Sequence, residues 1–302
     1  MNGKYLILIP IVLAIVGIVV YSAVINNEHK VSKAQDSRTI FWRHIHGLGI
    51  DPTNHNILYI ATHGDFYQSV NGGPPIKVDE QRADYMAFNA PADSGVPLYA
   101  SGHPSTGGNT GLIKSTNGGK TWESVATVLD PPVDFHAMAV SQSDPSVIIG
   151  FDSEGRGIFK TMDGGKTWER SENPDVVTAL TISPNDSQVI FAGTGKGIFQ
   201  SNDGAKSWIQ LEQYNGILVF ALTFDEKILY ASTGQFGLSR STDLGNTWEK
   251  INSPKLTITS IAVDSQNNIL YVAGYSSGGY QEIYKTTNDG KSWDLIGTNK
   301  EL

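Results

Sequence analysis

Imidazole side chains are concentrated in the first half of the chain, at the ends of apolar, strand-like segments. Five of the seven histidines stand at such ends, and they are His44, His46, His63, His103 and His136. Imidazole nitrogens suit zinc, copper, iron and nickel, and carboxylates can complete the ligand shell. One hypothesis is therefore a divalent transition metal whose ligands are His46, His63, His103 and His136, joined by Asp84 or Asp134. No tight spacing such as His-Glu-x-x-His is present, so only convergence in space could build this site.

Acidic and basic residues near the same strand ends allow a second chemistry, the hydrolysis of a glycosidic bond. That reaction needs an acid and a second carboxylate beside the scissile bond. The catalytic candidates are Asp84, Asp134 and Asp152. The ligand-binding candidates are His44, Arg82, Arg156 and Glu154. The arginines could bind an acidic sugar, whereas isolated aspartates also commonly cap turns.

Both hypotheses depend on a repeated turn, Ser/Thr-x-Asp/Asn-x-Gly-x-x-Trp, that recurs through the chain. Five copies end at Trp122, Trp168, Trp208, Trp248 and Trp293, and a sixth, over residues 69–76, has lost its Trp. The Asp or Asn can accept bonds from the backbone of a tight turn, and the Gly can adopt a positive φ. The Trp starts the next strand and can pack a large ring. The copies lie 40 to 46 residues apart, a period typical of stacked units or propeller blades.

Each period contains four short segments with alternating apolar residues and many β-branched or aromatic side chains, which predicts strands. The fold class is therefore all-β, a six-bladed β-propeller of four-stranded blades, with the repeated turn between the third and fourth strands of each blade. In other propellers the inner strand starts at the face where ligands bind. We expect the five histidines to meet on that face, on blades one to three, while blades four to six place no charge at the corresponding positions.

The repeated turn resembles the Asp-box, or bacterial neuraminidase (BNR) repeat, of sialidases, sortilin-type receptors and photosystem II assembly-factor propellers. Residues 44–49, 61–64, 100–104 and 134–137 resemble more narrowly a bacterial extracytoplasmic Asp-box family labelled glycosylhydrolase. This resemblance implies a glycan or similar cell-envelope ligand in the pocket rich in His and Asp. The Arg-Ile-Pro motif of sialidases is absent. A metal-binding propeller and a non-catalytic assembly scaffold remain alternatives.

The N-terminus is predicted to lie in a membrane. Residues 5–25 form an uncharged apolar run of 21 residues, which is long enough to cross a bilayer as a helix. We expect residues 1–25 to be a membrane anchor, or else a signal peptide, followed by a linker over residues 26–38 and the propeller over residues 39–302. The protein would then be a single-pass protein of the cell membrane with an extracytoplasmic propeller.

Composition excludes several other classes of site. The chain has no cysteine, so disulfides, thiolate metal sites and Cys nucleophiles are excluded. Its net charge of −8 argues against a nucleic-acid partner, because binding to phosphates requires clustered positive charge. The sequence predicts no oligomeric state.

Overall fold

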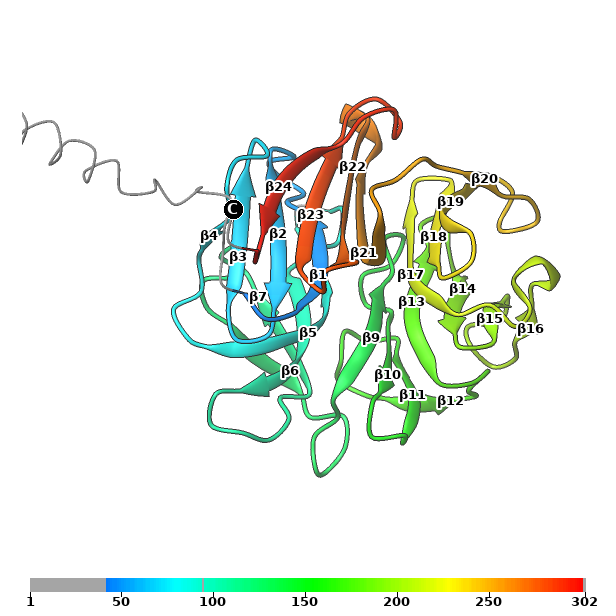
Figure 1. The fold of residues 1–302 in the computed structure, drawn as a ribbon. Helices are drawn as coiled ribbons and strands as arrows, with labels where there is room; N and C mark the ends of the chain where they lie inside the picture. The colour runs from blue at the N-terminus through cyan, green and yellow to red at the C-terminus, as the bar shows by residue number, and fades with distance from the viewer. Residues whose placement is uncertain (1–41, 94, 301–302) are drawn as a thin grey trace, which may run out of the picture. The chain divides into compact units, whose positions relative to one another are not determined.

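Twenty-four strands form six antiparallel sheets of four strands each (Figure 1). The computed structural model describes residues 42–93 and 95–300. The first blade contains β1 (Ile45–Ile50), β2 (Ile57–Thr62), β3 (Phe66–Val70) and β4 (Ile76–Lys77). The second contains β5 (Ala83–Asn89), β6 (Leu98–Pro104), β7 (Leu112–Ser115) and β8 (Glu123–Ala126). The third contains β9 (Phe135–Val140), β10 (Ile148–Asp152), β11 (Gly157–Thr161) and β12 (Glu169–Ser171).

The second half repeats this plan. The fourth blade contains β13 (Val177–Ser183), β14 (Asp186–Thr194), β15 (Gly197–Ser201) and β16 (Ile209–Gln210). The fifth contains β17 (Val219–Asp225), β18 (Ile228–Thr233), β19 (Gly237–Ser241) and β20 (Glu249–Lys250). The sixth contains β21 (Leu256–Asp264), β22 (Ile269–Ser276), β23 (Gln281–Thr286) and β24 (Asp294–Thr298). Two short 3-10 turns, η1 (Glu212–Tyr214) and η2 (Ser265–Asn267), are the only helical elements among the described residues.

The first strand of every blade lies at the central axis. Each of these six strands contacts the first strand of the next blade, and β21 contacts β1 to close the ring. Within each blade the strands follow one another in chain order. The predicted six-bladed, four-stranded all-β propeller is confirmed. Among the described residues no helix is long and apolar enough to span a bilayer, and the expected anchor and linker lie outside those residues.

The repeated turn joins the third and fourth strands of each blade, as predicted. In the third blade the Asp163 carboxylate accepts bonds from Thr167 N at 2.9 Å and Thr167 Oγ1 at 2.6 Å. Thr161 Oγ1 accepts from Gly165 N at 3.0 Å, and Gly165 has a φ of 94°. These bonds satisfy backbone groups that the tight turn would otherwise leave unpaired. Ala205 occupies the glycine position of its copy with a φ of 71°, a conformation that costs free energy for a residue with a Cβ.

The core lies between adjacent blades, and Trp42 is more deeply buried than the tryptophans of the repeated turn. The tryptophans of the repeated turn are only partly buried, and Trp168 packs beside Phe135. Trp42, which lies outside every repeat, has only 3% of its surface exposed. It packs edge-to-face on Tyr67 of the first blade and joins a cluster that contains Ile296 of the sixth. The N-terminal residue of the described chain therefore seals the junction between first and last blades.

Candidate metal centre

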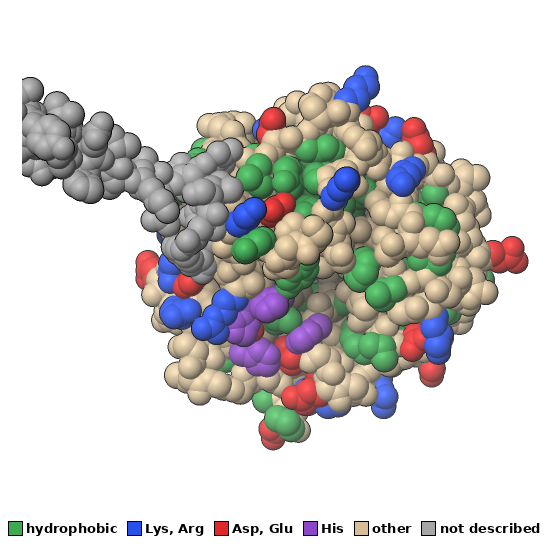
Figure 2. All heavy atoms as spheres, viewed as in Figure 1, with side chains coloured by type: hydrophobic (Ala, Val, Ile, Leu, Met, Phe, Trp, Pro, Cys, Tyr) green, Lys and Arg blue, Asp and Glu red, His purple; other side chains and the backbone are tan. Residues whose placement is uncertain are grey.

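Three neighbouring blades bring their histidines to one face. In each antiparallel blade, the start of the first strand lies beside the end of the second. His46 is near the start of β1, and His63 follows β2 and forms a β-bridge with Asp84. Asp84 in turn pairs with His103 across β5 and β6. His136 lies near the start of β9. Figure 2 shows the histidines of this face as one patch with acidic side chains among them.

Three of these side chains, His46, His63 and Asp84, form a cluster that is called the first group below. Its carboxylate lies between two imidazoles, with His46 Nε2 3.1 Å from Asp84 Oδ1 and His63 Nδ1 2.6 Å from Asp84 Oδ2. His46 Nε2 and Asp84 Oδ1 are both buried atoms, and they face each other in this contact. One potential ligand atom from each residue lies within 4.8 Å of the others. These three atoms are close enough to hold one cation together.

The second group is His103, Asp134 and His136, and it has the same composition. Asp134 Oδ2 lies 2.8 Å from His136 Nε2 and 3.4 Å from His103 Nε2. Ser153 Oγ donates to the same oxygen at 2.6 Å, while the buried Oδ1 has no partner. His103 Nδ1 lies 3.1 Å from the carbonyl oxygen of Gly108, which leaves Nε2 facing the carboxylate. The three ligand atoms again lie within 4.8 Å of one another.

The electrostatics of both groups keep the carboxyls ionised. Burial raises the pKa of Asp84, but contact with His46 and the positive potential of His63 and His103 outweigh burial, so the pKa lies below its usual value. Asp134 behaves alike: burial is outweighed mainly by bonds from His136 and Ser153. An anionic carboxylate between two imidazoles is a metal ligand set, whereas a general acid requires a raised pKa.

Two histidines have shifted pKa values of opposite sign. The pKa of His136 is raised, chiefly by its hydrogen bond with Asp134, with smaller effects of nearby carboxylates against some burial. The pKa of His44 is lowered by burial and by repulsion from His46 and His63. At neutral pH the His44 ring is therefore more readily deprotonated and able to bind a metal ion, whereas the His136 ring is more readily protonated.

The remaining predicted site residues lie close by but are engaged differently. Asp152 is fully buried. Its carboxylate accepts hydrogen bonds from Arg156 Nε at 2.7 Å, from Arg156 Nη2 at 3.0 Å and from the backbone N–H of Asp134. Arg156 Nη2 also pairs with Glu154 Oε2 at 3.1 Å and donates to the Pro132 carbonyl. These charges hold the loop that carries Asp134. Arg82 is different, because its side chain is 67% exposed and has only a 3.7 Å contact with Asp65.

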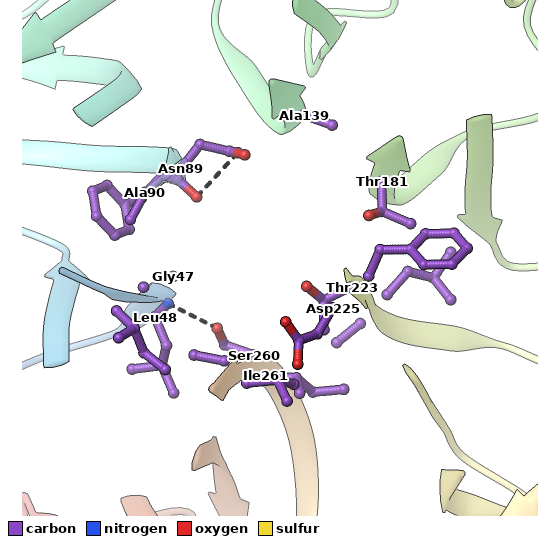
Figure 3. A pocket seen from close by; sticks show the side chains of 18 of the residues that line it. Gly47, Leu48, Asn89, Ala90, Ala139, Thr181, Thr223, Asp225, Ser260 and Ile261 are labelled. Atoms are coloured by element: carbon purple, nitrogen blue, oxygen red, sulfur yellow. Dashed lines mark hydrogen bonds between the residues drawn. The ribbon is translucent and has the colours of Figure 1, made fainter. Parts of the chain in front are cut away.

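A channel of about 530 Å³ runs along the axis and is lined by the first strands of all six blades. His46 of the first group and His136 of the second both line it, so the two groups flank the same opening. In Figure 3, Thr181, Thr223 and Asp225 project toward the open space. Asp225 was not predicted as a site residue; burial raises its pKa, and its Oδ2 atom has no hydrogen-bond partner. Asp225 is the last residue of the inner strand β17, and nothing in the sequence pattern distinguishes this position as a site.

Comparisons with known proteins bear on the fold. Residues 235–281 match a family described as a beta-propeller repeat. No curated protein sequence matches the chain. Among solved structures, the Niastella koreensis GH74 enzyme is similar with a TM-score of 0.62 and 19% identity, and the Xanthomonas campestris GH74 xyloglucanase with 0.57 and 16%. Each match covers 83% of this chain, which spans 45% of each enzyme. YCF48 bound to D1 peptide matches with a TM-score of 0.48, 16% identity, 72% of this chain and 68% of its own. This chain is thus a propeller similar in fold to glycosylhydrolase propellers.

Proposed function

We propose that the propeller binds divalent transition-metal ions at the first and second groups. The observation that carries the proposal is the double occurrence of two imidazoles and one carboxylate with ligand atoms within 4.8 Å. A buried polar atom without a partner costs free energy, and Asp134 Oδ1 of the second group is such an atom. An ion bound there would give this oxygen a partner.

The donor set narrows the class of ion. Two imidazoles and one carboxylate suit zinc and non-heme iron(II), and they leave coordination positions for water or a ligand. Calcium and magnesium prefer all-oxygen shells, so they fit less well. Asp152 and Arg156 would support the second group from outside by holding the Asp134 backbone.

Metal content of the purified full-length chain tests the proposal. After equilibration with zinc and removal of loose ions, we expect two ions per chain by elemental analysis. The double substitution of His63 and His103 to Ala should remove both ions, while leaving the melting temperature of the metal-free protein nearly unchanged because both side chains are substantially exposed.

His55→Ala is the matched control, because His55 also lies 3.0 Å from a buried aspartate, Asp264, but belongs to neither group. This variant should keep both ions. A wild-type chain that retains no ion at micromolar free zinc would overturn the proposal.

A glycan ligand at the same face is the second candidate, and the similarity in fold to GH74 propellers is the observation that favours it. Arg82, largely exposed, could bind an acidic sugar. If Asp84 and Asp134 are the catalytic pair, Asp84→Asn should abolish hydrolysis of a glycan, with the fold intact. The lowered pKa values of both carboxyls argue for binding over acid catalysis. A scaffold role without catalysis predicts neither metal uptake nor hydrolysis.

We also propose the setting in which the propeller works. The bonding of the repeated turn supports its assignment as an Asp-box. The apolar run over residues 5–25 supports a single membrane anchor with the propeller on the extracytoplasmic side. Full-length protein found trimmed near Ser22 and free in the medium would replace the anchor with a signal peptide.

A further inference from the structure

We infer that His44 is a fourth ligand of the first group, so that the two metal groups are unequal. This inference rests on the proposed metal function and extends it. The first group becomes a site of three imidazoles and one carboxylate, whereas the second keeps three ligands and an open position for a small anion or water. Structural metal sites are closed by four protein ligands, and sites that bind exchangeable ligands keep one position open.

The three imidazoles of His44, His46 and His63 surround a common point. Their ring centroids are 6.2 Å apart in all three pairs. Three points 6.2 Å apart have a common centre about 3.6 Å from each of them. For comparison, a zinc–nitrogen bond of ~2.1 Å places an ion ~3.2 Å from the centre of a coordinating ring. The ligand atoms that lie within 4.8 Å of one another belong to His46, His63 and Asp84, so the His44 ring must turn to bring its nitrogen to a shared ion. The His44 side chain is exposed, so it can make this adjustment.

Tyr275 orients the His44 ring. Its hydroxyl forms a short hydrogen bond with His44 Nδ1, and the two ring centroids are 6.1 Å apart. Because Nδ1 is used in this bond, Nε2 is the nitrogen left for an ion. Ligating histidines commonly use their other nitrogen in this way, which fixes the tautomer and the ring orientation. The His44 backbone is fixed as well, since its carbonyl accepts the His63 N–H at 2.9 Å.

The second group has no equivalent of His44 among the described residues. The carboxylate of Asp152 lies beside this group, but both of its oxygens are held by Arg156 or by the Asp134 backbone. Ser153 Oγ is bonded to Asp134. His136 also lines the central channel, so the open position of the second group would be reached from there.

Cobalt(II) and azide together distinguish the two kinds of site, because azide can enter only a coordination shell with an open position, and the visible bands of bound cobalt report its entry. Titration of the full-length chain with cobalt chloride should show two ions, of which only the one in the second group has bands that azide shifts. In His44→Ala the first group loses a protein ligand, so azide should shift the bands of both ions. Tyr275→Phe removes only the hydroxyl, and it should weaken binding of the azide-insensitive ion by roughly 10- to 100-fold.

The outcomes separate this inference from the metal proposal. If cobalt does not bind the wild-type chain, the proposed function fails. If two ions bind and His44→Ala leaves one of them insensitive to azide with unchanged affinity, only the fourth ligand is wrong. Wild-type bands that shift with azide for both ions would also overturn the inference, because they would show an open position in the first group. His55→Ala should match the wild-type chain in every measurement.

Discussion

At the scale of single residues, the central fact is that two buried carboxylates each lie between two imidazoles. Asp84 is 8% exposed and Asp134 is 4% exposed. A buried carboxylate needs a positive or hydrogen-bonding partner, and imidazoles meet this need in two ways. When protonated they neutralise the carboxylate directly, and when neutral they share a bound cation with it. Under the proposed function, the site therefore exchanges protons for metal ions.

This exchange predicts that the two groups lose metal at different pH values. The pKa of His136 is raised by Asp134, while that of His44 is lowered by burial and by its neighbours. A raised pKa means that the imidazole takes up a proton sooner as pH falls, and a protonated imidazole cannot bind an ion. As pH is lowered from 8, the second group should therefore release its ion before the first group does.

Elemental analysis after equilibration at a series of pH values measures this order, and His103→Ala identifies which group each step belongs to. This variant should lack the step at higher pH and keep the other. Simultaneous loss of both ions, with a single midpoint near the usual pKa of histidine, would contradict the predicted difference.

At the scale of elements, the repeated turn combines backbone satisfaction with a titratable group. Three copies carry an aspartate, and these are Asp163, Asp203 and Asp243. The pKa of each is lowered to about 2, chiefly by a bond from the hydroxyl of the residue immediately before the Trp, which is Thr167, Ser207 or Thr247. Two copies carry asparagine instead. Asn117 accepts from Thr121 N at 3.0 Å and donates to Thr121 Oγ1 at 2.8 Å, so it forms the same bonds without a charge.

The aspartates should make the propeller sensitive to acid. Their folded pKa lies below the unfolded value of 3.8, so their contribution to stability is present above pH 4 and is lost as pH falls toward 2. Replacing Asp163, Asp203 and Asp243 with Asn should keep the turns and remove this dependence. Melting temperatures at pH 5 and pH 2.5 measure it, with the wild-type chain expected to lose more than the triple variant. An equal loss in both would show that the turn carboxylates do not contribute.

The sequence was sufficient for these elements because their determinants are local. Alternating apolar residues specify strands, and Ser/Thr, Asp/Asn and Gly at fixed spacing specify the turn. It also placed the histidines on one face, since propeller topology fixes which strand ends meet. It did not divide them into two groups, because that division depends on pairings such as Asp84 with His103 across β5 and β6. The clamp of Arg156 on Asp152 was missed for the same reason: a charge near a site can bind a ligand or another residue, and only geometry decides.

At the scale of the whole molecule, the ring must close between its first and last blades, and within residues 42–93 and 95–300 no strand is shared between them. Side chains and backbone do this work instead. Ile45 N donates to Gln281 Oε1 at 2.6 Å, and Leu48 N donates to Ser260 Oγ at 2.9 Å. Tyr275 of the sixth blade reaches His44 beside the first. Closure of the ring and the geometry of the first group are therefore coupled.

Trp42 adds a large buried ring to this closure. Its ring packs on Tyr67 and lies so close to the last blade that a Cβ at Gly297 would be only 2.8 Å from it, and its carbonyl accepts from Asn299 Nδ2 at 3.3 Å. Trp42→Ala should therefore reduce the free energy of unfolding by about 3–5 kcal/mol. Trp168→Ala, at a partly exposed ring in the repeated turn, should cost less. Chemical denaturation of both variants measures this difference in the free energy of unfolding. If the cobalt spectrum of Trp42→Ala equals that of the wild-type chain, the first group keeps its geometry when the contact between the first and last blades is weakened. A larger loss at Trp168 than at Trp42 would mean that the repeated turns, and not the N-terminal seal, limit the stability of the ring.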